Sequence, residues 1–169
     1  LSYFNSYNLP VTILRPFNTF GPRQSSRAVI PTIISQALIS DKIYIGNLQT
    51  KRNFNFIDDT INGYILAIKN INKSAGNIIN LGSKVEISIK DLIKMTEKLL
   101  DKKFTIVAEQ KRIRPKKSEI FRLVANNQKA YQILKWKPKM KNLNDFQLYL
   151  NKTIKWYEKN QNKEYFNVR

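Results

Sequence analysis

The sequence predicts an α/β domain, and three observations lead to this class. Short apolar runs bounded by Gly, Pro or Asn alternate with longer segments of helical periodicity. The 42% hydrophobic content of the 169 residues is that of a folded globular chain. The predicted order is strand, helix, strand, strand, helix, strand, helix, strand, helix, helix, which mixes both element types throughout. It lacks the regular βα units of a complete doubly wound sheet, so we expect only part of such a sheet.

The first predicted strand, V-T-I-L at residues 11–14, lies between two prolines and leads into a loop at residues 15–24. The side-chain donors of this loop are Arg15, Asn18, Arg23 and Gln24. Ligands of open α/β sheets bind beyond the carboxyl ends of the strands, so the loop suits an anionic, hydroxylated ligand. A plain connecting turn with solvated arginines is the alternative.

The helices and strands after this loop are predicted from the spacing of the hydrophobic residues. Helices are predicted at about residues 28–39, 58–71, 89–100, 127–134 and 144–159, and further strands at 43–45, 53–57, 77–81 and 104–107. For the helix after Asp58 and Asp59, we expect at least one aspartate to cap the N-terminus. Its buried face is predicted to be Ile61, Tyr64, Ile65 and Ile68. S-I-K-D at residues 88–91 has the form of a capping box. The last helix is predicted to bury Leu143, Phe146, Leu150 and Ile154.

The amino-acid composition excludes several kinds of chemistry and bears on the location and partners of the protein. There is no Cys and no His, so disulfides, thiolate chemistry and the commonest general base and metal ligand are excluded. No apolar run approaches the ~20 residues of a membrane span, and no signal peptide is visible, which favours a cytoplasmic location. The formal net charge of +18 is typical of a nucleic-acid-binding module, which we keep as the alternative function. The lysines are scattered rather than gathered, which does not favour it.

Basic side chains recur in three predicted loops. They are Arg15 and Arg23, then Lys51 and Arg52, then Arg112 and Arg114. If the strands form one sheet, these loops converge, and guanidinium groups suit a diphosphate because they donate in pairs. No acid–base set accompanies them: neither Tyr3 nor Tyr7 is followed by a lysine four residues later, and there is no G-x-G-x-x-G.

Several motifs, taken together, are specific for one family. They are L-R-P-F-N-T-F-G-P at residues 14–22, K-R-N-F-N-F-I-D-D at 51–59, G-N-I-I-N-L-G-S at 76–83, R-P at 114–115, N-N-Q-K-A at 126–130 and L-K-W-K-P at 134–138. In this order they resemble the C-terminal half of extended short-chain dehydrogenase/reductase enzymes, the NAD-dependent nucleotide-sugar epimerases and dehydratases. R-A-V-I-P-T at 27–32 and R-I-R-P-K-K-S-E at 112–119 most resemble bacterial 4,6-dehydratases of UDP-N-acetylhexosamines, of the legionaminic-acid type.

The resemblance implies a partial Rossmann-type fold, made of its C-terminal strands, with the small α/β substrate-binding domain at about residues 18–50 and 84–140. The implied substrate contacts are Asn18, Arg27, Ala28, Val29, Arg52, Arg112 and Arg114. The backbone of Pro16 and Phe17 is expected near the nicotinamide of NAD. The implied partner is a UDP-sugar, and the resemblance implies that the intact enzyme is usually a homodimer. It implies no membrane and does not favour nucleic acid as a partner.

The resemblance also implies what to expect beyond these residues. The family's dinucleotide loop and its Tyr-x-x-x-Lys pair are expected upstream of Leu1, so we expect a fragment that is inactive alone. Asn53 stands where the family usually has Asp, and Lys135 where it has Gly. A third reading, a stand-alone pseudoenzyme, has only the shortness of the chain in its favour.

Overall fold

The computed structural model of the chain describes residues 1–112, 115 and 118–160. The chain divides into two compact units and passes between them several times. Unit 1 comprises Leu1–Thr19, Asn53–Glu86 and Val124–Asp145. Unit 2 comprises Phe20–Arg52, Ile87–Leu123 and Phe146–Arg169.

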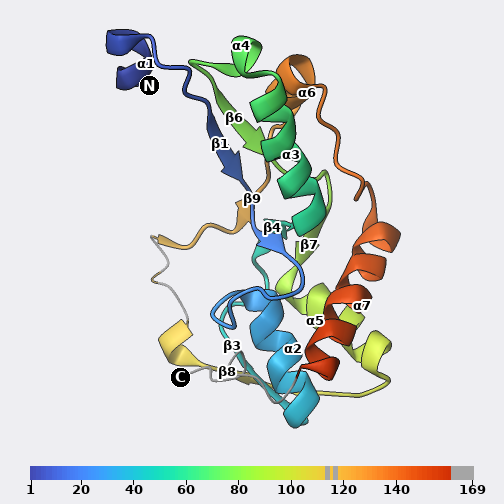
Figure 1. The fold of residues 1–169 in the computed structure, drawn as a ribbon. Coiled ribbons are helices and arrows are strands. Elements are labelled where there is room, and N and C mark those ends of the chain that lie inside the picture. Colours follow the sequence, from blue (N-terminus) through green and yellow to red (C-terminus); the bar gives the residue numbers. More distant parts are fainter. Residues whose placement is uncertain (113–114, 116–117, 161–169) are drawn as a thin grey trace. The chain divides into compact units, whose positions relative to one another are not determined.

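Unit 1 is built on two parallel strands, β1 (Ile13–Pro16) and β6 (Ile78–Leu81), which are paired along their whole length (Figure 1). Helix α6 (Gln128–Leu134) packs against β6 and α3 (Ile57–Lys69), while α1 (Ser2–Tyr7) and α4 (Ile71–Ser74) complete the unit. The core contains Ala67, Ile79, Leu81, Ala130, Leu134 and Trp136. The strands alternate with helices, as the sequence predicts.

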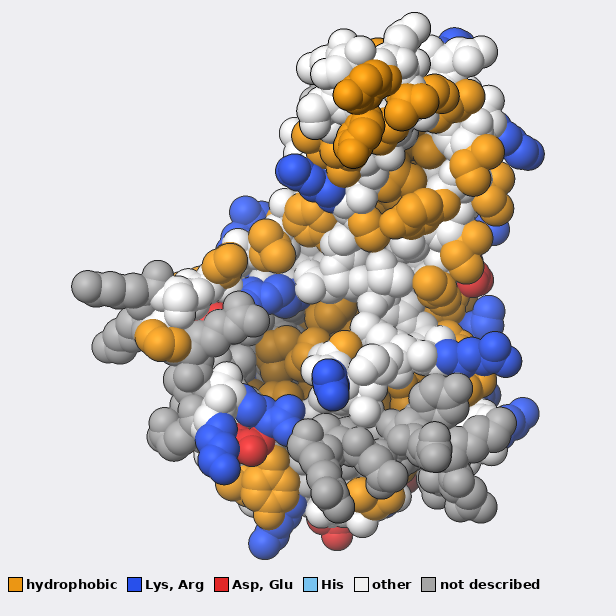
Figure 2. All heavy atoms as spheres, turned by 60° about the vertical axis from the view of Figure 1, so that its left-hand side comes forward, with side chains coloured by type: hydrophobic (Ala, Val, Ile, Leu, Met, Phe, Trp, Pro, Cys, Tyr) orange, Lys and Arg blue, Asp and Glu red, His pale blue; other side chains and the backbone are white. Residues whose placement is uncertain are grey.

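Helix α3 buries a different face from the predicted one. Its buried residues include Gly63 and Ala67, and a Cβ at Gly63 would collide with the Leu81 side chain of β6. The helix therefore approaches the strand through its smallest side chains. The four large apolar residues predicted to be buried, Ile61, Tyr64, Ile65 and Ile68, are 44–73% exposed. Figure 2 shows apolar side chains gathered over this unit.

The expected capping role of Asp58 or Asp59 is also wrong. The N-cap of α3 is Phe56, and no side chain caps it. Asp59 is instead 3% exposed, and its carboxylate accepts hydrogen bonds from the backbone N–H groups of Lys139 (2.9 Å) and Met140 (3.2 Å). The aspartate joins α3 to the segment that follows α6.

Unit 2 contains a second parallel pair, β3 (Lys42–Ile45) and β8 (Thr105–Ala108). Helix α2 (Val29–Ile39) packs against β3 and against α5 (Ile89–Leu100), and most of α7 (Leu143–Lys159) belongs to this unit. The fully buried residues include Ile33, Ile34, Ile43, Leu92, Leu150 and Ile154. In α7, the predicted inward positions 146, 150 and 154 are buried, whereas Leu143 at the start of the helix is 49% exposed.

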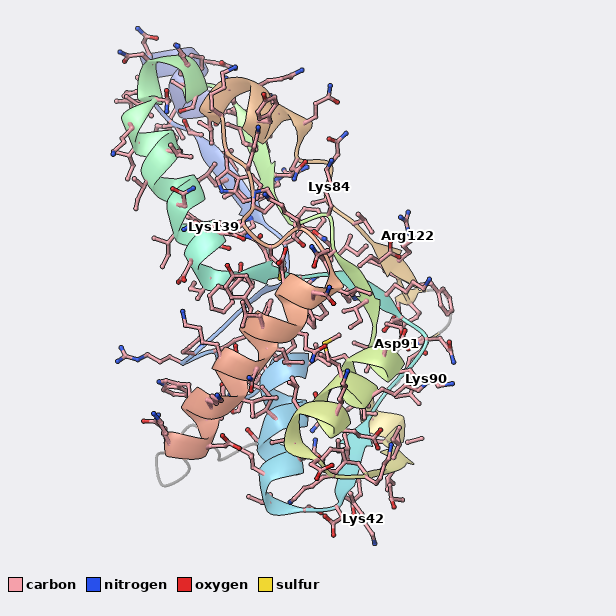
Figure 3. All side chains as sticks on the ribbon, turned by 90° about the vertical axis from the view of Figure 1, so that its right-hand side faces the viewer. Lys42, Lys84, Lys90, Asp91, Arg122 and Lys139 are labelled. Carbon is pink, nitrogen blue, oxygen red and sulfur yellow. The ribbon has the colours of Figure 1, made fainter. Side chains whose placement is uncertain are left out.

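The capping box predicted for α5 is confirmed. The Ser88 hydroxyl accepts a hydrogen bond from the backbone N–H of Asp91 at 3.0 Å and donates one to the Asp91 carboxylate at 2.6 Å. Asp91 lies in the first turn of the helix, next to the exposed Lys90 (Figure 3).

The segment predicted as one strand over residues 53–57 is divided into β4 (Lys51–Asn53) and β5 (Asn55–Phe56). Strand β4 lies between β7 (Glu86–Ser88) and β9 (Arg122–Leu123), and Lys51 is paired with Arg122 in the parallel β4–β9 ladder. Neither β7 nor β9 was predicted, because two or three residues are too few for an alternation to show. The remaining short elements are β2 (Thr19–Phe20) and the 3₁₀ turn η1 (Gln110–Arg112).

Candidate functional site

The residues after β1 are held to neighbouring backbone. Pro16 ends the strand, and the backbone N–H of Phe17 donates to the carbonyl of Leu81 at 2.8 Å, so the β1–β6 pairing continues one residue further. Asn18 is exposed, and its Nδ2 donates to the backbone carbonyl of Asn53 at 2.9 Å. The loop is thus ordered by contacts within unit 1, at the carboxyl end of a parallel strand, where ligands of such sheets bind.

Asn53 replaces the family's usual Asp for a local reason. The residue is fully buried, and its Nδ2 donates to the carbonyls of Ser83 (2.5 Å) and Val85 (2.7 Å). A carboxylate has no N–H to offer these carbonyls. The amide nitrogen is therefore matched to these carbonyls, whereas the buried Oδ1 of the same side chain has no hydrogen-bond partner among the described residues.

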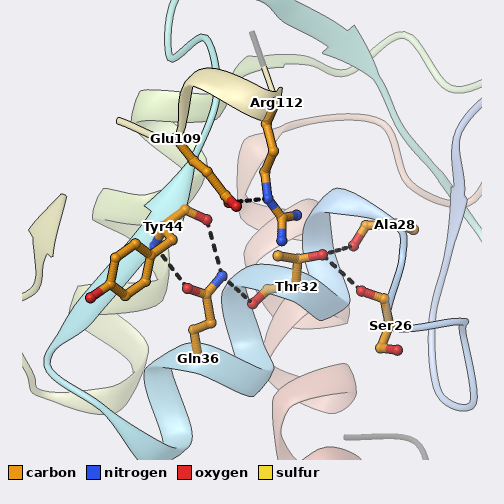
Figure 4. A network of polar contacts seen from close by, with 7 residues as sticks. All are labelled: Ser26, Ala28, Thr32, Gln36, Tyr44, Glu109 and Arg112. Atoms are coloured by element: carbon orange, nitrogen blue, oxygen red, sulfur yellow. Dashed lines mark hydrogen bonds and ion pairs between the residues drawn. The ribbon is translucent and has the colours of Figure 1, made fainter. Parts of the chain in front are cut away.

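The start of α2 carries three of the predicted substrate contacts. Ala28 is the N-cap with extended backbone, Val29 is the first helical residue, and Arg27 before them is exposed. No side chain caps the helix. The hydroxyl of Thr32 bonds instead to the carbonyls of Ser26 and Ala28, both at 2.8 Å (Figure 4). The Thr32 hydrogen bonds thus fix the turn before α2. The first backbone N–H groups of α2 have no side-chain cap, and this arrangement suits an oxygen-rich ligand.

Arg112 belongs to the same unit. It lies in η1, and its Nε donates to the carboxylate of Glu109. In Figure 4 its guanidinium points toward the first turn of α2 at Thr32. Gln36 of α2 exchanges two hydrogen bonds with the backbone of Tyr44 in β3, at 2.7 and 3.2 Å, which fixes the strand against the helix. Unit 2 thus brings Arg112 toward the start of α2.

Arg52 is the most constrained of the predicted arginines. Its Nη1 donates to the backbone carbonyls of Ile120 (2.6 Å) and Lys51 (3.0 Å), and its Nη2 lies 3.6 Å from the carboxylate of Glu119. Only 17% of the Arg52 side chain and 7% of the Glu119 side chain are exposed. A separation of 3.6 Å is an ion pair without a direct hydrogen bond, so Nη2 keeps N–H groups to offer.

The other predicted site residues are less informative. Arg114 lies outside the described residues, so its contact stays a prediction. Arg15 belongs to unit 1, whereas Arg23, Arg52 and Arg112 belong to unit 2, and the convergence of the three basic loops also stays a prediction.

The sequence reasoning overlooked two features. The spacing Tyr-x-x-x-Lys does occur once, at Tyr131 and Lys135. The Lys135 ammonium lies 5.6 Å from the centre of the Tyr131 ring, and Lys135 itself is the left-handed C-cap of α6 with φ of 56°. The pair therefore ends a helix with a cation–π contact, in the place of the glycine that the family usually has.

The second overlooked feature is Tyr157 in α7. It is fully buried, and its hydroxyl donates to the carbonyl of Gln24 at 2.5 Å. Burial raises the pKa of Tyr157 to about 12. The contact holds the loop that precedes Arg27 and Ala28. A signal was available, because Tyr157 lies three residues after Ile154 on the predicted inward face.

Comparison with known proteins places this arrangement in a family. The sequence profile of the GDP-mannose 4,6 dehydratase family matches residues 1–145. The chain belongs to this family. The resemblance inferred from the motifs is thereby confirmed at the level of the family.

Individual relatives agree with this assignment. The human dTDP-D-glucose 4,6-dehydratase is 30% identical over 165 residues, which cover 94% of this chain and 45% of that protein. The UDP-glucuronate 4-epimerase of Thermodesulfobacterium geofontis is 29% identical over 161 residues, with 94% and 46% covered. The crystal structure of UDP-glucuronic acid 4-epimerase from Bacillus cereus, in complex with UDP-glucuronic acid and NAD, superposes with a TM-score of 0.83 at 29% identity, covering 94% of this chain and 48% of that one. The chain thus spans about half the length of these relatives, and the partial Rossmann-type fold is confirmed.

In the part of the chain that the structure describes, no helix is both long and apolar enough to cross a bilayer.

Proposed function

We propose that this chain supplies nucleotide-sugar-binding residues of an NAD-dependent 4,6-dehydratase or epimerase that acts on a UDP-sugar such as UDP-N-acetylglucosamine. The proposal is supported by membership of the family and by relatives that are dehydratases and epimerases of nucleotide sugars. The observation that carries the proposal is the way in which Arg52 is held. Its guanidinium is held in one orientation by two carbonyls and by Glu119, and Nη2 retains donors for a phosphate oxygen.

Within unit 2, Arg52 and Arg112 provide permanent positive charge for the diphosphate. At the uncapped start of α2, the N–H of Ala28 already donates to Ser25, so Val29 provides the backbone N–H group for the uridine. In unit 1, Asn18 remains the proposed contact to the diphosphate region. The substrate-binding portion at residues 18–50 and 84–140 also stays a proposal.

NAD, when bound, would supply the hydride acceptor for oxidation of the sugar ring. Pro16 has no N–H and the Phe17 N–H already donates to Leu81, so these two residues can offer such a group only backbone carbonyl oxygens. The described residues contribute binding and orientation, and we expect the 169-residue chain alone not to turn over UDP-N-acetylglucosamine.

The test is calorimetric titration of the chain with UDP-N-acetylglucosamine. Arg52→Gln is expected to weaken binding about tenfold, since a charge-assisted pair to phosphate contributes at least about 1.4 kcal/mol. Arg122→Gln is the matched control, because it removes the same charge from the neighbouring strand β9 and belongs to none of the family motifs. Equal weakening by both variants would mean that only net charge is sensed. Turnover by the chain alone would refute the proposed inactivity.

The same titration with a short DNA duplex distinguishes the proposed function from the alternative, a nucleic-acid-binding module. A nucleic-acid-binding module needs basic residues gathered on one face. On the face drawn in Figure 2, Lys and Arg side chains are scattered among apolar and neutral ones. We expect any DNA binding to be weak and unaffected by UDP-N-acetylglucosamine.

A further inference from the structure

A pocket of about 560 Å³ opens on unit 1, between the first half of α6, the segment after this helix and the loop that follows β6. Its lining includes Trp136, Pro138 and Met140, and three lysines, Lys84, Lys137 and Lys141. None of these residues belongs to the proposed nucleotide-sugar contacts. The volume is that of a site for a small organic molecule.

The apolar lining is held in place by buried hydrogen bonds. Trp136 is 1% exposed, and its indole N–H donates to the backbone carbonyl of Asp59 at 2.9 Å. The backbone N–H of Met140 donates to the carboxylate of the same aspartate at 3.2 Å. Because Trp136 is buried and its indole N–H is already satisfied, it forms the buried base of the pocket, and the accessible apolar surface comes from Tyr131 and Pro138. The pocket is therefore preformed and apolar on this side.

Two contacts lie near the lysines of the lining. Asn127 at the start of α6 donates its Nδ2 to the carbonyl of Gly82 at 2.8 Å, which ties the helix to the loop that carries Lys84. The ammonium of Lys137 lies 4.8 Å from the centre of the Tyr131 ring. A second hollow of about 540 Å³ adjoins the first and shares Lys84 and Lys141 with it. Among the described residues that line the first pocket, none is acidic.

We propose that this pocket binds a small amphipathic anion, with its planar apolar part against Tyr131 and Pro138, next to the buried Trp136, and its carboxylate, or a group of the same charge, between Lys84 and Lys141. The two shared lysines lie where the apolar pocket meets the more open second hollow, which is where a charged group stays partly hydrated. Lys137, beside Tyr131, adds positive potential without closing the pocket. Most of the lining lies within the proposed substrate-binding portion at residues 84–140, but none of it is one of the proposed nucleotide-sugar contacts, and the proposal does not rest on the proposed function.

The test is an NMR titration of the ¹⁵N-labelled 169-residue chain with 2-naphthoate and with its neutral analogue 2-naphthylmethanol. The chain has two tryptophans, and Trp156→Phe assigns the indole signal of Trp136. We expect saturable shifts of the Trp136 indole, and binding of 2-naphthoate about tenfold tighter than that of the alcohol, as expected for a ligand charge that meets two lysines.

The double variant Lys84→Gln/Lys141→Gln is expected to weaken 2-naphthoate about fivefold and to leave the alcohol unchanged, because only the charge is removed. The control Lys42→Gln/Lys90→Gln removes two exposed lysines of unit 2, shown with Lys84 in Figure 3, and is expected to change neither probe. Raising the salt from about 0.05 to about 0.5 M screens the lysine charges of the unsubstituted chain. It therefore repeats the comparison of 2-naphthoate with the alcohol without a substitution. Equal affinity for the two probes, equal effects of the two double variants, or shifts that spare Trp136 would each overturn the proposal.

Discussion

Replacing Asp59 by Asn tests whether this buried carboxylate joins two segments of unit 1. The carboxylate accepts the backbone N–H groups of Lys139 and Met140 through its two separate oxygens, at 2.9 and 3.2 Å. An Asn side chain has the same shape but only one acceptor, so one of the two N–H groups must face an NH₂ group instead. We expect unit 1 to lose stability while its backbone stays in place.

The magnitude follows from the two hydrogen bonds. A bond to a charged acceptor contributes about 1.5–3 kcal/mol and a neutral one about 1 kcal/mol, so the bond that survives weakens by about 1 kcal/mol. The other bond is lost, and its buried N–H costs about 1–3 kcal/mol. The expected loss in the free energy of unfolding is therefore about 2–4 kcal/mol.

Urea denaturation followed by circular dichroism measures this loss, and hydrogen exchange locates it. The amides of Lys139 and Met140 are expected to lose protection, whereas the Trp136 indole, which bonds to the backbone carbonyl of Asp59, keeps its signal. Asp58→Asn is the matched control. It removes the same charge from the same first turn of α3, where the helix dipole accounts for about 0.3–1 kcal/mol.

The comparison of the two variants isolates the hydrogen bonds to Lys139 and Met140, which Asp59 makes and Asp58 does not. If Asp59→Asn costs no more than Asp58→Asn, the carboxylate does not hold the two segments together, and the reasoning fails. The same conclusion would follow if the Lys139 and Met140 amides kept their protection in Asp59→Asn.

Four further predictions follow from the structure. Asn53→Asp, which turns acceptors toward the carbonyls of Ser83 and Val85, is expected to lower the free energy of unfolding by at least about 2 kcal/mol, measured in urea. Lys135→Gly, at a left-handed C-cap, is expected to raise it by about 0.5–1 kcal/mol, and a lower melting temperature would contradict this. Because the pKa of Tyr157 is raised from 10.0 to about 12, the unfolded chain loses this proton first, and stability falls as pH rises above 10. Between pH 8 and pH 11 the unsubstituted chain should lose about 1.4 kcal/mol more than Tyr157→Phe, and equal losses would show that this phenol does not contribute. The exposed apolar residues of α3 favour self-association, so replacing Ile65 and Ile68 by Glu should reduce it, as measured by light scattering.

Helix α3 shows what hydrophobic periodicity can predict and what it cannot. Its hydrophobic spacing predicts a helix, and a helix is found at Ile57–Lys69. The same spacing points to the wrong buried face, because close packing against β6 requires a position without a Cβ, and Gly63 supplies it. Apolarity identifies a helix, but the steric fit to its neighbour decides which side is buried.

The candidate site divides in the same way. Ser88 and Asp91 are three residues apart, so their capping box is a local property and could be predicted. Arg52 was singled out by its motif, but its partner Glu119 lies 67 positions along the chain, and no local pattern links the two. The Lys139 and Met140 amides that bind Asp59 lie even further from it in the sequence, by 80 and 81 positions.

By itself, the sequence determined the α/β class, most of the helices and the family. These depend on periodicity, caps and motifs, and the residues of each such pattern lie within a few positions of one another. Only the tertiary structure decided that Asp59 is a buried acceptor rather than a cap, that Asn53 must be an amide, and that Arg52 is held by Glu119. These depend on which distant segments meet. Burial makes each unpaired polar group costly, so the role of such a residue is set by the partner that folding brings to it.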